Sequence, residues 1–503
     1  MTWSELRSVL RDRALIVSEA PGAGEESPTV AGVAYDSRLV RRGDVFVALK
    51  GQHADGTMFA RDAIDRGASA IVSEQAAPEG VRVRWAVVSD ARLAIALLAD
   101  AVYGHPSCEM RVVGITGTNG KTTTAYLVAS IFEANGIRCG ILGTVVYRVG
   151  NEVREATRTT PEAPDVHALL REMADSGCGA CTMEVSSHAL SLRRVDGITF
   201  SAGVFTNLTR DHLDFHGDME SYFQAKRRLF EMLPRDAPSL LNIDDPRGES
   251  LVQVAPRPVT YGINQPADVR PGRPLSFSLH GLTFPIDTPR GTVRIQSRLV
   301  GRPNVYNILA AVATAVALDL PFDAIERGVQ DLHGVPGRFE VVSSLSDEVT
   351  VVVDYAHTDD ALRNLLETAR PLVKGQLITV FGCGGDRDRT KRPLMGAVAG
   401  RLSDVIVITS DNPRSEDPNR IIDEIQRGIT PDTRRGITQR IMTIVDRRAA
   451  IAKAIEEARP GDLVLIAGKG HEKYQVIGDR TLPFDDAAVA REALARRRSG
   501  MRN

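Results

Sequence analysis

A glycine-rich segment that could bind phosphate lies between a short apolar run and an amphipathic stretch. Residues 114–123 read GITGTNGKTT. Glycines let the backbone wrap around a phosphate, and amides at a helix N-terminus supply positive potential. In such a loop Lys121 would reach the outer phosphates of a nucleotide, and the Thr122 hydroxyl would face Mg²⁺. The spacing departs from the usual phosphate-loop pattern whichever glycine is counted first, but the strand and helix context favours a nucleotide site. We assign to it Gly117, Thr118, Asn119, Gly120, Lys121, Thr122 and Thr123.

A carboxylate lies at the end of a second predicted strand, in the segment MEVSSH over residues 183–188. Glu184 would sit at the carboxyl edge of a sheet, where a carboxylate can hold a metal ion. Standing alone, a glutamate in this position is more often structural. Beside a phosphate loop, we interpret Glu184 as a Mg²⁺ ligand.

Three further patterns near the middle of the chain carry weaker indications. His212 and His216 have the spacing of a helical zinc pair, but Gly217 breaks the helix and no third zinc ligand follows closely, so zinc is disfavoured. Cys178 and Cys181 form a C-x-x-C pair that precedes a strand and does not open a helix, which disfavours a redox site. Residues 222–230 form an amphipathic helix whose lysine, taken alone, would be a solvated charge.

In the last third, four predicted strands each end in a polar loop, at residues 354–357, 381–388, 411–414 and 468–472. In an open parallel sheet, ligands bind at the carboxyl edge of the strands. Both signs of charge occur in these loops, which suits a zwitterionic ligand better than a simple phosphate. We therefore predict a substrate site at this edge.

The elements that must position these residues alternate between strands and helices. Continuous β-branched runs such as 112–116 and 463–466 predict buried parallel strands, and 122–135 and 359–369 predict helices. Residues 308–318 are apolar nearly all round, which indicates a buried helix. The breaks GHPS at 104–107 and GVPG at 334–337 divide the chain into three α/β domains, 1–108, 109–334 and 335–503.

Composition excludes several classes of protein. Among 503 residues, 62 Lys and Arg balance 64 Asp and Glu, so no global field favours nucleic acid or a membrane surface. No apolar run reaches the roughly 18 residues that span a bilayer, and residues 1–6 lack a basic signal-peptide region. Five cysteines are an odd count that fits a reducing compartment. We expect a cytoplasmic monomer that binds neither nucleic acid nor membranes.

Together, in their order and over almost the whole chain, these motifs resemble the Mur ligase family of ATP-dependent amino-acid-adding enzymes in peptidoglycan precursor synthesis. The resemblance implies a UDP-binding α/β domain, a central P-loop-type ATPase domain on a mainly parallel sheet, and a C-terminal Rossmann-like domain. It implies that meso-2,6-diaminopimelate is added to the D-glutamate of UDP-N-acetylmuramoyl-L-alanyl-D-glutamate. The residues implied to contact the UDP substrate are Tyr35, Ser37, Gln52, His53, Ala54, Thr159, Thr160, Ser186, Arg194 and Lys226. At Leu192, family members often carry Gln instead.

The resemblance also reinterprets Lys226. In the matching motif this lysine is carbamylated by CO₂, which would convert an ammonium of intrinsic pKa about 10.4 into an anionic oxygen ligand. The implied Mg²⁺ ligands are Thr122, Glu184, His212 and carbamylated Lys226. Asn304, Arg338 and Asp354 match the remaining ATP contacts, so ATP would bridge the second and third domains, whose closure is expected.

The segment DNPR at 411–414 is the family's marker for diaminopimelate. Arg414 would offer a bidentate fork to the distal carboxylate of the amino acid, and Asn412 a further hydrogen bond. L-lysine lacks that carboxylate and would leave the arginine unpaired. The implied diaminopimelate contacts are Arg387, Asp411, Asn412, Pro413, Arg414, Gly468 and Glu472.

The implied reaction is acyl-phosphate formation from the D-glutamate γ-carboxylate, followed by attack of an amine, with Lys121 and Mg²⁺ neutralising charge. Either His357 or His212 could accept the amine proton. Three alternatives remain at this stage. They are a lysine-adding ligase of the same family, a folylpolyglutamate synthetase, and a nucleotide switch without ligase activity.

Overall fold

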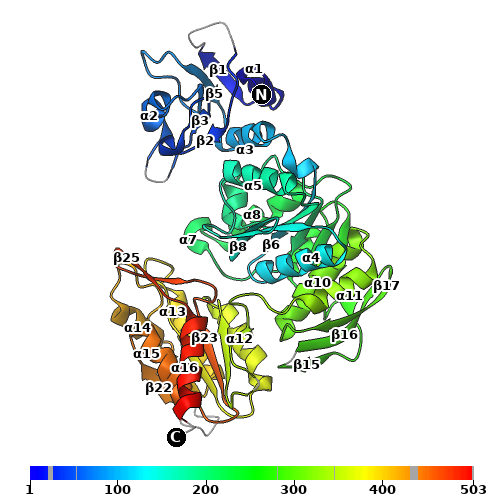
Figure 1. Cartoon of the computed structure of the whole chain (residues 1–503), viewed down its shortest axis with the longest axis vertical. Helices are drawn as coiled ribbons and strands as arrows, with labels where there is room; N and C mark the ends of the chain where they lie inside the picture. Colours follow the sequence, from blue (N-terminus) through cyan, green and yellow to red (C-terminus); the bar gives the residue numbers. More distant parts are fainter. Residues whose placement is uncertain (21–26, 52–53, 280, 345, 431–439, 501–503) are drawn as a thin grey trace.

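The computed structural model describes residues 1–20, 27–51, 54–279, 281–344, 346–430 and 440–500. Three sheet-containing units follow one another along the chain, coloured blue, cyan to green, and yellow to red in Figure 1. The domain borders remain predictions. The first falls between a short helix, η3 (Pro106–Cys108), and strand β6 (Arg111–Thr116), and the second between helix α11 (Phe322–Asp331) and strand β18 (Glu340–Val341).

The N-terminal unit is a five-stranded sheet in the order β1-β5-β4-β3-β2, in which only the β1–β5 pair is antiparallel. Helix α1 begins with a capping box, in which the Thr2 hydroxyl accepts from the Glu5 amide and the Glu5 carboxylate accepts from the Thr2 amide. Its elements are α1 (Trp3–Asp12), β1 (Ile16–Ala20), β2 (Val33–Ala34), η1 (Ser37–Leu39), β3 (Val45–Ala48), η2 (Gly56–Phe59), α2 (Ala60–Asp65), β4 (Ala70–Ser73), β5 (Arg84–Val88) and α3 (Ala91–Val102).

The central unit has an eight-stranded sheet in the order β13-β12-β11-β6-β10-β7-β8-β9, parallel from β13 to β7, and a separate four-stranded antiparallel sheet of β14 to β17. Its other elements to the end of the large sheet are α4 (Lys121–Ala134), β7 (Cys139–Leu142), β8 (Val146–Val149), β9 (Glu152–Glu155), α5 (Ala163–Asp175), β10 (Ala180–Glu184), α6 (Ser187–Ser191), β11 (Ala202–Phe205), α7 (Leu213–His216), α8 (Met219–Glu231), β12 (Ser239–Asn242), α9 (Pro246–Leu251) and β13 (Pro258–Tyr261). The smaller sheet and the following helix are β14 (Arg270–Pro271), β15 (Ser276–Ser278), β16 (Gly281–Thr288), β17 (Gly291–Ser297) and α10 (Arg302–Ala317).

Both faces of the central sheet are buried, which explains the continuous apolar strands. One core lies under α4, α10 and α11, and the other under α5 and α8. Helix α10 is the predicted buried helix, and it begins six residues earlier than predicted because its first turn is polar. Within the described residues no helix is long and apolar enough to cross a membrane.

The C-terminal unit is a six-stranded sheet, β18-β19-β23-β20-β21-β22, parallel except for β18, with a hairpin of β24 and β25 above it. The four strands predicted to end in polar loops are β19, β20, β21 and β23, and their parallel pairing places those loops at one edge. The remaining elements are β19 (Thr350–Asp354), α12 (Asp359–Ala369), η4 (Arg370–Leu372), β20 (Leu377–Phe381), α13 (Lys391–Leu402), β21 (Val405–Ile408), α14 (Pro418–Gln426), β22 (Arg440–Thr443), α15 (Arg447–Glu457), β23 (Leu463–Ala467), β24 (Tyr474–Ile477), β25 (Arg480–Pro483) and α16 (Asp486–Gly500).

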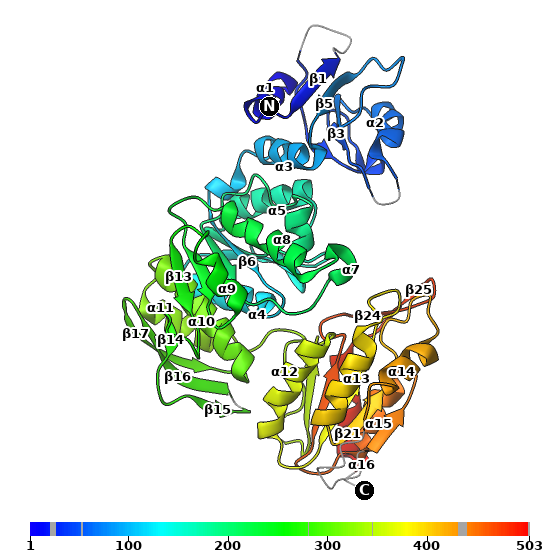
Figure 2. The same cartoon turned by 180° about the vertical axis from the view of Figure 1, so that it is seen from behind.

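Both views show the three units arranged one after another, with α7 of the central unit on the side that faces the hairpin of the C-terminal unit (Figures 1 and 2). Side chains join the central and C-terminal units close to the phosphate loop. The hydrogen-bonded pairs are Asn119–Asp360 at 3.2 Å, Arg338–Thr122 at 3.3 Å and Arg210–Thr390 at 2.5 Å. The carboxyl edges of the two sheets, where ligands are predicted to bind, therefore meet.

Candidate active site

The phosphate loop is shaped by two glycines that no other residue could replace without strain. Gly117 has φ +145°, and a Cβ there would lie 1.8 Å from Thr206 Oγ1. Gly120 has φ +89°, and a Cβ there would lie 2.4 Å from Asn307 Oδ1. Both conformations favour glycine. The loop therefore passes tightly from β6 into α4, whose first amides can meet an anion.

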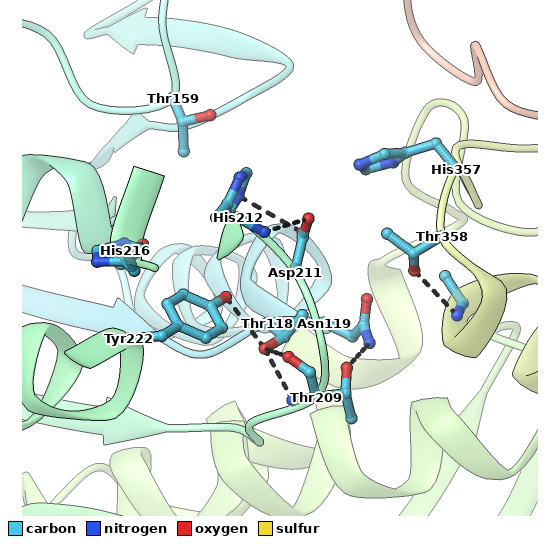
Figure 3. Close-up of polar contacts among 12 residues, drawn as sticks. Thr118, Asn119, Thr159, Thr209, Asp211, His212, His216, Tyr222, His357 and Thr358 are labelled. Carbon is cyan, nitrogen blue, oxygen red and sulfur yellow. Dashed lines mark hydrogen bonds and ion pairs between the residues drawn. The ribbon is translucent and has the colours of Figure 1, made fainter. Parts of the chain in front are cut away.

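A second segment, directly after β11, braces the loop. The Asn119 amide donates to Asn207 Oδ1 at 2.9 Å, and Thr206 Oγ1 donates to the Asn119 carbonyl at 2.6 Å. A further contact from this segment is visible in Figure 3, where the Thr209 amide donates to Thr118 Oγ1 at 3.0 Å. Sequence reasoning did not select Thr206 or Asn207, although their position at a strand end follows the same rule that selected Glu184.

Two lysines from different helices converge on the phosphate loop. Lys121 Nζ donates to the Gly117 and Thr118 carbonyls, both at 2.9 Å, and Lys226 Nζ donates to the Gly117 carbonyl at 2.8 Å. Lys226 is only 1% exposed and lies 4.4 Å from the centre of the Tyr222 ring. Burial, together with the nearby Lys121 cation, holds the pKa of Lys226 well below its usual value. Lys226 is therefore not the solvated charge that its helix pattern alone suggested.

Glu184 is buried at the end of β10 and is held by one residue. The Thr144 amide donates to Glu184 Oε1 at 2.8 Å, and the Thr144 hydroxyl donates to Oε2 at 3.0 Å. A Cβ at Gly143 would lie 2.4 Å from Oε1, so the carboxylate occupies space that only a glycine leaves open. Thr144 was not foreseen, because a threonine in the short loop between β7 and β8 carries no distinctive pattern.

His212 lies at the start of the four-residue helix α7 with φ +53°. Its amide donates to Asp211 Oδ1 at 2.8 Å, and burial lowers the pKa of the ring to about 4, so the imidazole is neutral near pH 7. His216 is hydrogen-bonded instead to Ser187 Oγ at 2.9 Å. In the described part of the chain no three His, Cys, Asp or Glu side chains gather to hold a metal ion by themselves.

His357 comes from the C-terminal unit, and in Figure 3 its ring points toward the segment that carries Asp211 and His212. Its Nδ1 lies 3.0 Å from the Tyr355 carbonyl, and burial lowers the pKa of the ring. The two candidate bases thus reach the same region from opposite units.

The residues predicted to contact the muramoyl-dipeptide gather around Glu184. Thr159 Oγ1 lies 3.0 Å from Thr144 Oγ1, and Thr160 Oγ1 donates to the Glu184 carbonyl at 2.8 Å. The Ser186 amide donates back to Thr160 Oγ1 at 3.2 Å. Arg194 donates to the Thr160 carbonyl at 3.1 Å and also pairs with Glu162 at 2.7 Å.

The predicted uridine contacts lie in the N-terminal unit, apart from this cluster. Ser37 is buried in η1 and Ala54 is exposed. Of the described members of this group, Tyr35 is linked to the central unit by a hydrogen bond of 2.9 Å from its hydroxyl to Asp165 of α5. Two further predicted contacts, Gln52 and His53, lie outside the described residues.

A cavity of about 390 Å³ lies between the central and C-terminal units. Asn304 and Arg338, both predicted ATP contacts, line it, and Arg338 stacks 4.5 Å from the centre of the Tyr355 ring. Asp354 holds the chain beside it by accepting from the Phe339 amide at 2.7 Å. The other lining residues are Leu279, Arg298, Leu299, Val300, His333, Gly334, Phe339, Glu340 and Val341.

At the carboxyl edge of the C-terminal sheet, the ends of β21 and β23 bring together hydrogen-bond donors and an acceptor. Arg414, at φ +51°, donates through one nitrogen to the Gly385 carbonyl at 2.6 Å, and within the described residues no other hydrogen bond occupies its guanidinium. Asn412 Nδ2 donates to Glu472 Oε2 at 3.0 Å. Lys469 lies in one of the predicted polar loops but was not among the predicted diaminopimelate contacts. It donates to the same carboxylate oxygen at 3.1 Å.

The other predicted amino-acid contacts surround this group. A Cβ at Gly468 would lie 2.6 Å from Asp411 Oδ2, and a Cβ at Gly385 would lie 1.9 Å from the Pro413 carbonyl, so both loops are closely packed. Arg387 is exposed, and its side chain lies beside Gly384, near Arg414.

The C-x-x-C pair has no place in this arrangement. Cys178 and Cys181 are both buried, and both are free thiols. Burial raises the pKa of the Cys181 thiol, which keeps it protonated and unreactive.

The fold and site define an α/β nucleotide-binding protein in which a phosphate loop faces a second ligand-binding sheet edge. Three family models match successive parts of the chain, one in each of the three units. They describe the Mur ligase family catalytic domain at residues 29–103, the Mur ligase middle domain at 115–315, and the Mur ligase glutamate ligase domain at 337–470.

Curated relatives match over nearly their whole length. The chain is 48% identical to a UDP-N-acetylmuramoyl-L-alanyl-D-glutamate–2,6-diaminopimelate ligase of Geobacter metallireducens, covering 96% of this chain and 98% of the relative. The protein of the same name from Solibacter usitatus is 49% identical over 92% of this chain and 93% of its own. A solved structure with that name has a TM-score of 0.68 at 34% identity, covering 99% of both chains. The chain belongs to the Mur ligase family, as its motifs predicted.

Proposed function

We propose that this protein is an ATP-dependent ligase that joins meso-2,6-diaminopimelate to the D-glutamate of UDP-N-acetylmuramoyl-L-alanyl-D-glutamate. The observation that carries the proposal is the meeting of two sheet edges. The edge with the phosphate loop faces the edge with Arg414 and Glu472, and Arg338 joins them by donating to Thr122 at 3.3 Å. The relatives with this name cover nearly the whole chain, including both edges.

The nucleotide would lie across the boundary between the two units. Its base would enter the cavity beside Asn304 and Arg338, and its phosphates would reach the loop at Gly117 to Thr123. Lys121 is the cation best placed to meet the outer phosphates, because its ammonium is already held at the loop by two carbonyls. The resemblance to the family assigns Asp354 to the ribose, and its carboxylate lies beside this boundary, where it accepts from the Phe339 amide.

The residues near the loop fit Mg²⁺, which prefers oxygen ligands. Glu184 presents a fixed, buried carboxylate at the end of β10, while Thr122 lies in the first turn of α4 and His212 at the start of α7. Lys226 fits only after modification, because an amine that donates to Gly117 cannot bind a cation. When bound, Mg²⁺ would neutralise phosphate charge during phosphoryl transfer.

We propose that Lys226 is carbamylated. The lowered pKa favours the neutral amine, whose lone pair attacks the carbon of CO₂ and which then releases a proton. The product is an anionic carbamate in a closed pocket between Tyr222 and the loop. The carbamate anion would attract the Lys121 ammonium, whereas a protonated Lys226 would be repelled by it.

The chemistry proceeds in two steps. A γ-carboxylate oxygen of D-glutamate attacks the γ-phosphorus of ATP, and ADP leaves. The amine of diaminopimelate then attacks the acyl carbon, loses a proton to a base, and expels phosphate to leave an amide. His357 and His212 both remain candidates for the base. We further propose that the enzyme acts as a monomer in the cytoplasm, where nucleotide precursors are available.

The two steps predict a specific transfer of oxygen. With both γ-carboxylate oxygens of the D-glutamate labelled with ¹⁸O, mass spectrometry should find one label in the released phosphate and one in the amide, because the acyl phosphate passes one oxygen on. Phosphate without label, formed at the rate of ATP loss, would contradict ligase chemistry and favour a nucleotide switch that only hydrolyses ATP.

A further inference from the structure

Lys469 occupies a position at the end of β23 where a lysine is unexpected. Its side chain is fully buried, between Gly468 at φ +119° and Gly470 at φ +55°. A Cβ at Gly470 would lie 2.7 Å from the Tyr355 Cβ, so the chain here packs too closely for a side chain. The two glycines thereby let the strand end turn sharply and direct Lys469 inward.

The ammonium of Lys469 is surrounded by oxygen atoms from the predicted amino-acid site. Nζ donates to Asn412 Oδ1 at 3.0 Å and to Glu472 Oε2 at 3.1 Å, and it lies 4.0 Å from Asp411 Oδ1. The next buried cation, Arg447, is already paired with buried Asp486 at 2.7 Å. Lys469 is thus the cation in direct contact with Glu472, and it acts on Asp411 together with Arg447 and Lys391.

These contacts determine which way the Asn412 amide faces. Its Oδ1 accepts from Lys469 and from the Val476 amide at 3.0 Å, and both of these groups are donors only. The nitrogen must therefore take the other side, where Nδ2 donates one hydrogen to Glu472. The amide has one N–H left, so Asn412 can offer a ligand only a donor.

The same contacts give the two oxygens of the Glu472 carboxylate different roles. Oε2 accepts from Asn412 and from Lys469. Among the described residues, no hydrogen bond uses Oε1. One oxygen is therefore held by the protein, and the other can meet an ammonium.

We propose that Lys469 is a positioning residue for the amino-acid substrate. By donating to both Asn412 and Glu472, Lys469 fixes which groups face the substrate. Asn412 and Arg414 then offer donors to the distal carboxylate of the amino acid. Glu472 Oε1 offers an acceptor to the adjacent ammonium. Diaminopimelate carries both groups on its distal carbon, whereas L-lysine carries only the ammonium. The inference rests on the proposed function and extends it to a residue that touches no substrate.

The test compares Lys469→Met with a matched control, Lys473→Met, in which a nearby exposed lysine is replaced. In Lys469→Met, the KM for diaminopimelate should rise about 10- to 100-fold, because buried Asn412 and partly buried Glu472 lose their shared partner. The KM for ATP and for the UDP substrate, and kcat at saturating diaminopimelate, should stay within about threefold of the parent. Lys473→Met should behave like the parent.

A double-mutant cycle separates positioning from a structural role. If Lys469 acts through Asn412, Lys469→Met should add little to the KM increase of Asn412→Ala. A diaminopimelate KM within about twofold of the parent in folded Lys469→Met, or an equal loss for all three substrates, would overturn the proposal. If that variant does not fold, Lys469→Gln decides by the same criteria, because a side chain one atom shorter cannot bridge both partners. A parent protein without diaminopimelate-dependent turnover would instead contradict the proposed function, and this inference with it.

Discussion

Replacing Lys121 with alanine is expected to lower kcat by on the order of 10²- to 10³-fold, comparable to the loss of one preorganised donor in a transition state. The reason lies in the placement of its ammonium, which is held by the Gly117 and Thr118 carbonyls where the outer phosphates would lie. Because Lys121 forms no close ion pair with a carboxylate of the described residues, the fold should survive. Steady-state ADP release and thermal melting, measured on the same preparation, check both expectations.

The matched control for this prediction is Lys374→Ala, which removes an exposed lysine from a loop of the C-terminal unit. It should leave ADP release unchanged. Near-normal turnover in Lys121→Ala would remove the phosphate role, and a lost melting transition would require the comparison to be repeated with Lys121→Met, which keeps the buried part of the side chain.

The second large effect is expected at Arg414. In Arg414→Ala, kcat/KM for diaminopimelate should fall about 10²- to 10³-fold, because a carboxylate that a guanidinium had paired would be left without its partner. The low turnover of L-lysine, which has no distal carboxylate, should hardly change. The ratio of kcat/KM for the two amino acids should therefore fall by about the same factor.

Arg420→Ala is the control for Arg414, since it removes an exposed arginine six residues further on, in α14. It should leave both amino acids unaffected. An equal loss of kcat/KM for diaminopimelate and L-lysine in Arg414→Ala would mean that Arg414 only supports the loop, through its bond to Gly385, and does not select the substrate.

The fold was largely predictable because buried parallel strands read as continuous apolar runs. The strand predicted at 463–466 is β23, Leu463–Ala467, and the helix predicted at 359–369 is α12, Asp359–Ala369. The start of α10 was less predictable. Its first turn, from Arg302, is polar because it faces the cavity at Asn304, so the apolar pattern begins only in the second turn.

The site was predictable where a residue type matched a strand end or a glycine-rich turn, as for Lys121 and Glu184. Lys226 shows what a local sequence pattern cannot predict. The amphipathic pattern of its helix predicts that the lysine is solvated. The lysine is buried only because α8 packs beneath the Gly117 carbonyl, which is a contact across 109 positions in the chain. Lys469 is a second case, since its partners Asn412 and Glu472 meet only when β21 and β23 lie in one sheet.

The central claim is best tested by measuring ADP release from the purified protein with ATP, Mg²⁺ and UDP-N-acetylmuramoyl-L-alanyl-D-glutamate. Parallel reactions would contain meso-diaminopimelate, L-lysine or no amino acid. We predict release only with diaminopimelate, accompanied by a product with the mass of the tripeptide nucleotide. Release with lysine alone would keep the ligase and contradict the role of Arg414. Release that does not depend on an amino acid would contradict the ligase itself.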